Sequence, residues 1–263
     1  MIDIQNSSDT RNIPLEKVGV KNLRYPVVVM DKENRSQSTT ATVDLFVNLP
    51  HDYKGTHMSR FVEVFHRHSA NLNMKQFLLM LSEIRTNLNA EKAFGSMTFP
   101  FFMKKSAPVT GAESIMEYTC TYEGEVSENS QKFFLKIKIP VTTLCPCSKA
   151  ISKSGAHNQR GIVTVKLRNK SLFWIEDVVR LIEDCASCGL YSILKRPDEK
   201  YVTEHAYDNP RFVEDVVREV YIALKNFSQS EKPFSWFSVE CENFESIHNH
   251  NAYAYTEYEG ENL

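Results

Sequence analysis

The chain has 263 residues, of which 42% are hydrophobic and 24% charged, a composition that excludes disorder over the whole chain. Lys and Arg total 31 and Asp and Glu total 33, so the formal net charge of -2 gives no overall attraction for nucleic acid or an anionic membrane. No apolar run approaches the roughly 20 residues of a membrane-spanning helix, and residues 1–10 contain no apolar signal-peptide core. We therefore expect a cytoplasmic protein without nucleic-acid or membrane partners, whose six cysteines are thiols rather than disulfides.

The first half of the chain predicts two strands, two helices and two further strands. Val43, Leu45 and Val47 alternate along the second strand and share one of its faces. Apolar residues recur at helical spacing in the two segments that follow. The six elements are expected at residues 19–30, 39–49, 59–70, 74–90, 93–103 and 114–123.

The second half repeats this order of elements, although no residue-level repeat accompanies it. Its strands and helices are expected at residues 132–142, 161–167, 175–186, 212–225, 234–241 and 252–258. A polar turn at 124–130 separates the halves, so we predict two modules, residues 1–126 and 127–263. An antiparallel sheet with helices packed on one face, in the α+β class, satisfies this order.

The segment 142–161 joins two predicted strands and holds the densest group of reactive side chains. Cys145 and Cys147 flank Pro146, which favours extended backbone at Cys145, and His157 can return toward them. Thiolate and imidazole are good ligands for zinc and similar ions. The ordinary alternative is a surface loop with incidental thiols, but the His, Lys and Arg residues nearby favour a metal or anion site.

Two later segments add candidates. His248 and His250 share one face if the chain there is extended, and such a pair can bind metal, transfer protons or cap a solvated loop. Glu199 is expected in a loop, where it can complete a metal site. Glu214 falls in the first turn of a predicted helix, where the helix dipole alone also favours an acid.

At these residues the sequence closely resembles GTP cyclohydrolase IB, a metal-dependent type I enzyme family that acts first in folate synthesis. The likeness extends over nearly the whole chain, and its first segment is the most specific one. The segments that carry it are Pro140–Lys149, Gly155–Gly161, Lys195–Lys200, Glu245–His250 and Asp9–Asn12.

This resemblance implies a tunnelling fold, in which each subunit carries two modules of two strands, two helices and two strands. It further implies a homotetramer with active sites at subunit interfaces. One divalent metal ion is expected in each site, and its ligand chemistry leaves zinc, manganese and iron open. The residue roles that the likeness implies are metal binding by Cys145, His157 and Glu199, catalysis by Cys147, Glu245, His248 and His250, and guanine recognition by Glu214.

The implied reaction converts GTP and water to 7,8-dihydroneopterin triphosphate and formate, through attack of metal-activated water on purine C8. His248 or His250 is the expected proton donor to N7. Lys149, Lys153 and Arg160 are candidates for the triphosphate, with solvated loop charge as the ordinary alternative.

Two other functions compete with this one. A tunnelling-fold nitrile reductase would use a cysteine nucleophile and a reduced nicotinamide, but it needs no metal ligands such as His157. A non-catalytic metal-binding assembly protein would hold its metal in a closed site with four protein ligands.

Overall fold

The computed structural model describes residues 5, 7–228 and 233–260. The chain divides into two compact units, of which unit 1 comprises Met1–Pro100 and Cys120–Leu135, and unit 2 comprises Phe101–Thr119 and Lys136–Leu263. Three strands, β3, β4 and β5, contribute residues to both units. The predicted modules 1–126 and 127–263 were defined by a repeated order of elements, whereas the two units are defined by compactness. The division into modules therefore remains a prediction.

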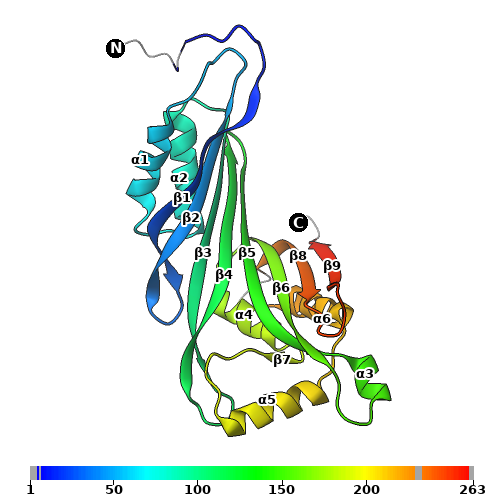
Figure 1. Cartoon of the computed structure of the whole chain (residues 1–263). Helices are drawn as coiled ribbons and strands as arrows, with labels where there is room; N and C mark the ends of the chain where they lie inside the picture. The colour runs from blue at the N-terminus through cyan, green and yellow to red at the C-terminus, as the bar shows by residue number, and fades with distance from the viewer. Residues whose placement is uncertain (1–4, 6, 229–232, 261–263) are drawn as a thin grey trace. The chain divides into compact units, whose positions relative to one another are not determined.

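Unit 1 is an antiparallel sheet with two helices on one face (Figure 1). Its elements are β1 (Leu15–Asp31), β2 (Arg35–Leu49), α1 (Met58–His68) and α2 (Met74–Asn87), with parts of β3 (Lys92–Ser106), β4 (Glu113–Ser127) and β5 (Gln131–Leu144). The helices bury Phe61 and Phe65 from α1 and Phe77 and Leu81 from α2. Each such side chain contributes roughly 1.5–3 kcal/mol by leaving water, so this face supplies much of the stability of unit 1.

Two glycines allow α2 to lie close to the sheet. A Cβ atom at Gly95 would lie 2.8 Å from Leu81 Cδ2, and one at Gly124 would lie 2.7 Å from Leu81 Cδ1. Both distances are too short for carbon atoms, so a larger residue at either position would displace the Leu81 side chain or the helix that carries it.

Unit 2 has the same kind of architecture with more connections. Its strands run in the hydrogen-bonded order β3-β4-β5-β6-β8-β9, and β7 pairs with β5. α6 packs against β8, β9 and α4. Besides parts of β3, β4 and β5, its elements are α3 (Pro146–Ile151), β6 (Asn158–Asn169), α4 (Ile175–Glu183), β7 (Cys188–Gly189), α5 (Arg196–Asp208), α6 (Val213–Asn226), β8 (Phe234–Asn243) and β9 (Ala252–Glu259).

Two helices of unit 2 lie where loops were expected. α3 occupies the centre of the predicted 142–161 loop, because Pro146 has the backbone angle that a first helical turn requires. Glu199, expected in a loop, lies in the first turn of α5. Pro197 suits the first turn of a helix, and the helix dipole favours the acids Asp198 and Glu199 there.

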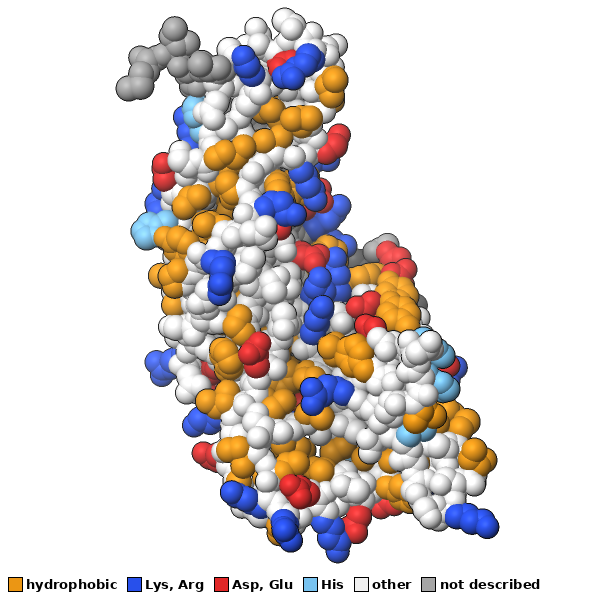
Figure 2. Space-filling model, in the orientation of Figure 1, with side chains coloured by type: hydrophobic (Ala, Val, Ile, Leu, Met, Phe, Trp, Pro, Cys, Tyr) orange, Lys and Arg blue, Asp and Glu red, His pale blue; other side chains and the backbone are white. Residues whose placement is uncertain are grey.

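The surface agrees with the balanced composition. On the face shown in Figure 2, basic and acidic side chains are both spread over the visible surface rather than gathered into fields of one sign. Within the described part of the chain, no helix is long and apolar enough to cross a membrane.

Candidate active site

The end of β5 passes directly into α3, and this junction positions Cys145. Cys145 is the N-cap of α3, with extended backbone angles of φ -68° and ψ 118°. Its sulfur accepts a hydrogen bond from the backbone N–H of Ser148, with N and S 3.4 Å apart. Cys145 is half-buried, whereas Cys147 lies within α3 and is exposed. The extended backbone predicted at Cys145 is confirmed.

Backbone contacts across the α3 loop hold His157 beside Cys145. The N–H of Cys145 donates to the His157 carbonyl at 3.1 Å. The N–H of His157 donates to Ser148 Oγ at 3.2 Å, and Ser148 Oγ donates to the Cys145 carbonyl, also at 3.2 Å. The loop thus returns His157 to the first thiol, and Ser148 connects the two.

The imidazole of His157 is oriented by two buried side chains for which the sequence predicted no role. Its Nδ1 lies 3.1 Å from Gln159 Oε1, and Gln159 Nε2 donates to Thr143 Oγ1 at 2.9 Å. An amide oxygen only accepts hydrogen bonds, so Nδ1 carries the proton in this arrangement. His157 Nε2 then keeps its lone pair and is the nitrogen able to bind a metal ion.

The segment after β8 brings a carboxylate to the same imidazole. β6 pairs with β8 so that Gly161 lies opposite Asn243, two residues before Glu245. Glu245 Oε2 lies 4.0 Å from His157 Nδ1, and the two side chains are only 12% and 15% exposed. Glu245 and His157 are therefore neighbours within a sheltered part of unit 2.

His248 and His250 lie further along the same segment and are exposed. Their rings stack with centroids 5.0 Å apart and planes 16° from parallel. This pairing keeps both imidazoles together at the surface, where protons can exchange with solvent.

The three basic candidates for the triphosphate differ in their surroundings. The ammonium group of Lys149 donates to the Tyr207 carbonyl and lies 4.3 Å from the centroid of the Tyr207 ring. It therefore ties α3 to the C-terminal end of α5. Lys153 and Arg160 are exposed.

Glu199 is exposed because its neighbour Asp198 is buried. The Asp198 carboxylate accepts hydrogen bonds from the backbone N–H groups of Val109 and Thr110, from the Thr110 hydroxyl and from the N–H of Lys195, at 2.7 to 2.9 Å. Burial alone would raise the pKa of Asp198, but these donors hold it below its ordinary value. Asp198 thus fixes the start of α5, and Glu199, one residue on, projects from a different side.

Glu214 is also exposed, in the first turn of α6. Just before this helix, the N–H of Arg211 donates to the Leu144 carbonyl at 3.0 Å. Since Leu144 precedes Cys145, the start of α6 lies beside the end of β5.

The structure thus places His157 beside the backbone of Cys145 and 4.0 Å from Glu245, with Cys147 on the adjoining helix. Tyr207, which contacts Lys149, lies eight residues after Glu199, which corresponds to about 12 Å of α-helix. Among the described residues, no three His, Cys, Asp or Glu side chains are grouped so that they could hold a metal ion. Two of the predicted ligands fit a metal centre chemically, and Glu199 is not brought to them in the single chain.

Comparison with known protein families shows the family to which the chain belongs. Residues 1–254 match the family described as type I GTP cyclohydrolase folE2. The chain belongs to this family. Relatives named GTP cyclohydrolase FolE2 include one from Syntrophus aciditrophicus, 54% identical over 98% of this chain and 100% of its own. Another, from Akkermansia muciniphila, is 55% identical over 97% of this chain and 96% of its own.

Solved structures of low sequence identity share the fold of this FolE2 family member. Uricase from Arthrobacter globiformis superposes with a TM-score of 0.53 at 10% identity, covering 94% of each chain. Urate oxidase from Bacillus sp. TB-90 gives 0.53 at 8% identity, covering 93% of this chain and 100% of that one. The predicted α+β class, with a tunnelling fold and helices on one face of an antiparallel sheet, is confirmed. The resemblance to a type I GTP cyclohydrolase is confirmed as well.

Proposed function

We propose that the chain is a metal-dependent GTP cyclohydrolase of the IB type, converting GTP and water to 7,8-dihydroneopterin triphosphate and formate in the first step of folate synthesis. Family membership supports the reaction. The observation that carries the metal-dependent form is the pairing of Cys145 with His157, whose Nδ1 is held by Gln159 so that Nε2 can act as a ligand.

Cys145 and His157 would hold the divalent ion, with Glu199 as the third ligand. Thiolate and imidazole suit zinc, and the carboxylate keeps manganese and iron as alternatives. When bound, such an ion supplies a water that is activated for attack near neutral pH. Three protein ligands leave room for that water, in contrast to a closed structural site.

The remaining residues act on the purine. Glu214, exposed at the start of α6, can accept two hydrogen bonds from the N1 and N2 donors of guanine, a pair that adenine lacks. The stacked His248 and His250 can give a proton to N7 as the bond between C8 and nitrogen breaks. We assign catalytic roles also to Glu245, whose Oε2 lies 4.0 Å from His157 Nδ1, and to Cys147, an exposed thiol on the adjoining helix.

We also propose that copies of the chain form a homotetramer with active sites at the interfaces. Two exposed apolar side chains close in sequence to the candidate residues support this assembly: Ile151 on α3 is 85% exposed and Ile247 is 63% exposed. Exposed apolar side chains of this size lower the free energy of an assembly when a partner subunit covers them and removes them from water. A neighbouring subunit would also offer a source for groups that the single chain does not bring together, such as Glu199.

A metal-resolved GTP assay tests the proposed function. Protein treated with chelator is reloaded separately with zinc, manganese, iron or magnesium, and formate and pterin fluorescence after oxidation are measured. We expect both products to appear together with one or more metals. Cys145→Ala and His157→Ala should each lose bound metal and activity together, while Cys185→Ala, which removes a half-buried thiol outside the site, keeps both.

Full metal occupancy with normal turnover in Cys145→Ala and His157→Ala would remove these residues from the ligand set. Neither product with any metal, from folded and metal-loaded protein, would defeat the cyclohydrolase proposal. Oxidation of a reduced nicotinamide on adding a deazapurine nitrile would then favour a nitrile reductase.

A further inference from the structure

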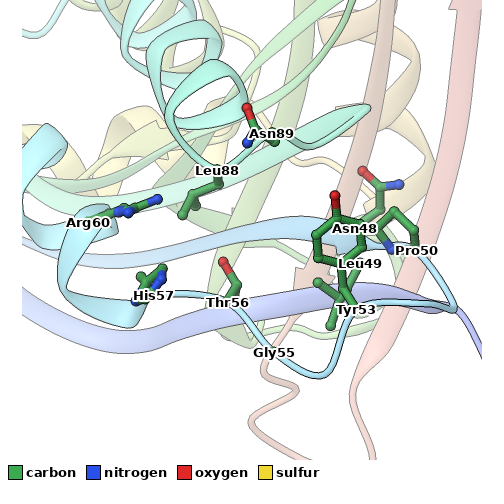
Figure 3. Close-up of a pocket in the computed structure, with 10 residues that line it drawn as sticks. All are labelled: Asn48, Leu49, Pro50, Tyr53, Gly55, Thr56, His57, Arg60, Leu88 and Asn89. Atoms are coloured by element: carbon green, nitrogen blue, oxygen red, sulfur yellow. The ribbon is translucent and has the colours of Figure 1, made fainter. Parts of the chain in front are cut away.

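Unit 1 contains a small pocket that the proposed reaction does not use. It lies between the loop after β2, the first turn of α1 and the end of α2 (Figure 3). The cavity volume is about 50 Å³, which is room for a few water molecules or one group of similar size. Among the described residues, no Asp or Glu lines it. The residues that the argument uses are Tyr53, Thr56, His57, Arg60, Leu88 and Asn89.

Thr56 supplies a hydroxyl that opens into the pocket and has no hydrogen-bond partner among the described residues. The residue is only 7% exposed. Figure 3 shows this hydroxyl directed into the space between Tyr53 and Arg60. A polar occupant of the pocket can therefore accept a hydrogen bond from this hydroxyl.

Arg60 supplies the positive charge. One guanidinium nitrogen, Nη1, donates to the Asn87 carbonyl at 3.1 Å, which holds the side chain against the end of α2. A guanidinium has five N–H donors, so the others are available to an anion. In the described ranges no carboxylate forms an ion pair with Arg60, so its charge is not neutralised by the protein.

The first turn of α1 adds donors of the same sign. Its N-cap residue, His57, makes no side-chain cap, and the first turn contains no acidic residue. The N–H of Arg60 donates to the His57 carbonyl at 3.2 Å, the N–H groups of the first turn receive no side-chain cap, and the helix dipole favours a negative charge there. The guanidinium and the helix start both favour a negatively charged ligand, and the Thr56 hydroxyl can donate a hydrogen bond to it.

We propose that this pocket binds a phosphate group. Its size suits one tetrahedral anion rather than a base, and its described lining, which offers donors and no carboxylate, favours an anion over a divalent cation. Two sources carry this chemistry, the triphosphate of GTP and free inorganic phosphate or pyrophosphate. Binding can be measured without turnover, so the inference stands or fails separately from the GTP reaction.

Calorimetric titration of chelator-treated full-length protein with pyrophosphate tests the site. Arg60→Gln removes the charge and should weaken binding roughly 10–100-fold, the usual range for a hydrogen bond to a charged group. Thr56→Val keeps the side-chain shape and should weaken binding by about 2- to 10-fold, and Thr56→Ser should restore it. Arg24→Gln, at an exposed arginine on β1 outside the pocket, is the matched control and should bind as the unaltered protein does. Circular dichroism verifies that each variant is folded.

Assays of the same variants with GTP show whether the bound phosphate group belongs to GTP or to a free phosphate ligand. Competition between pyrophosphate and GTP, with a raised KM in Arg60→Gln, assigns the pocket to the substrate triphosphate. Pyrophosphate binding without competition and with an unchanged KM assigns it to a free phosphate ligand. Either result supports the phosphate site. Absence of pyrophosphate binding at millimolar concentration, equal binding by the Arg60 and Thr56 variants, or an equal loss in Arg24→Gln would overturn it.

Discussion

At the scale of single side chains, Gln159 has the most influence on what His157 can do. Its amide accepts from Nδ1 and donates to Thr143, so it fixes both the tautomer and the ring orientation of the histidine. Gln159 is 7% exposed, and no other role for its buried amide is visible among its hydrogen bonds. It is therefore a positioning residue for the proposed metal ligand.

Replacing Gln159 with Leu keeps the approximate volume and removes both hydrogen bonds. The imidazole is then free to change tautomer and to rotate, and we expect metal affinity to fall roughly 10–100-fold, as for other residues that orient metal-binding histidines. Metal titration with a competing chelator measures this, and Gln159→Glu, which keeps an acceptor toward Nδ1, should retain more affinity than Gln159→Leu. Equal metal affinity in Gln159→Leu and the unaltered protein would contradict the role.

The residues that carry reactive groups could be named from the sequence, but their supports could not. Cys145 and His157 stand in one short segment, so their meeting depends on a single loop. The link from Gln159 to Thr143 depends on how β5 pairs with β6, and register between strands is decided by the packing of the whole sheet. The buried position of Asp198 depends on the turn at Val109 and Thr110, far away in sequence, so its neighbours in the sequence do not reveal it.

At the scale of elements, long periodic segments were predicted well and short ones were not. Each predicted strand and helix corresponds to an observed element, with ends that differ by a few residues. α3 has six residues and β7 has two, too few for a hydrophobic period to appear. α5 has 13 residues, but only Asp198 and Ala206 are buried, so its sequence carries no apolar stripe.

Asp198 holds the start of α5 in position, so replacing it should lower the stability of the protein. In Asp198→Asn an amide replaces one acceptor oxygen and meets backbone N–H groups, so the turn at Thr110 and the start of α5 lose their shared anchor. Glu199 moves with this turn. We expect a lower melting temperature and, if Glu199 is a ligand, a roughly 10–100-fold loss of metal affinity.

Thermal unfolding and metal titration of the same Asp198→Asn sample measure the two effects. Glu204→Gln, an exposed acid on the same helix, is the control and should alter neither. An unchanged melting temperature in Asp198→Asn would show that α5 does not need this anchor.

At the scale of the whole molecule, unit 2 contains weak acids whose pKa values are raised: the buried thiol of Cys241 and the half-buried side chains of Cys185 and Tyr191. Burial, with Glu219 and Asp184 nearby, raises the pKa of Cys185 to about 12. Burial also raises the pKa of Cys241 to about 12 and that of Tyr191 to about 12. In the unfolded chain these groups ionise near their ordinary values, 9.0 for the thiols and 10.0 for the phenol. The folded state therefore favours their neutral forms.

The stability that these groups give is fully present below pH 9 and is lost as the pH rises toward 12, because only the unfolded chain can ionise them easily. We expect the melting temperature of chelator-treated protein to fall above about pH 9. Cys185→Ala isolates one group, and its melting-temperature deficit relative to the unaltered protein should shrink between pH 8 and pH 11. A deficit that is constant with pH would contradict the raised pKa of Cys185.

The last strand, β9, has a consequence for how the protein behaves on dilution. β9 pairs with β8 along one side, and no other described strand pairs with its second side. Tyr253 and Tyr255 stand 59% and 53% exposed on it. A strand edge of this kind offers a row of backbone donors and acceptors to another copy of the chain. If copies join along β9, the melting temperature becomes a function of protein concentration, and enzyme kept at nanomolar levels loses stability that a concentrated stock retains.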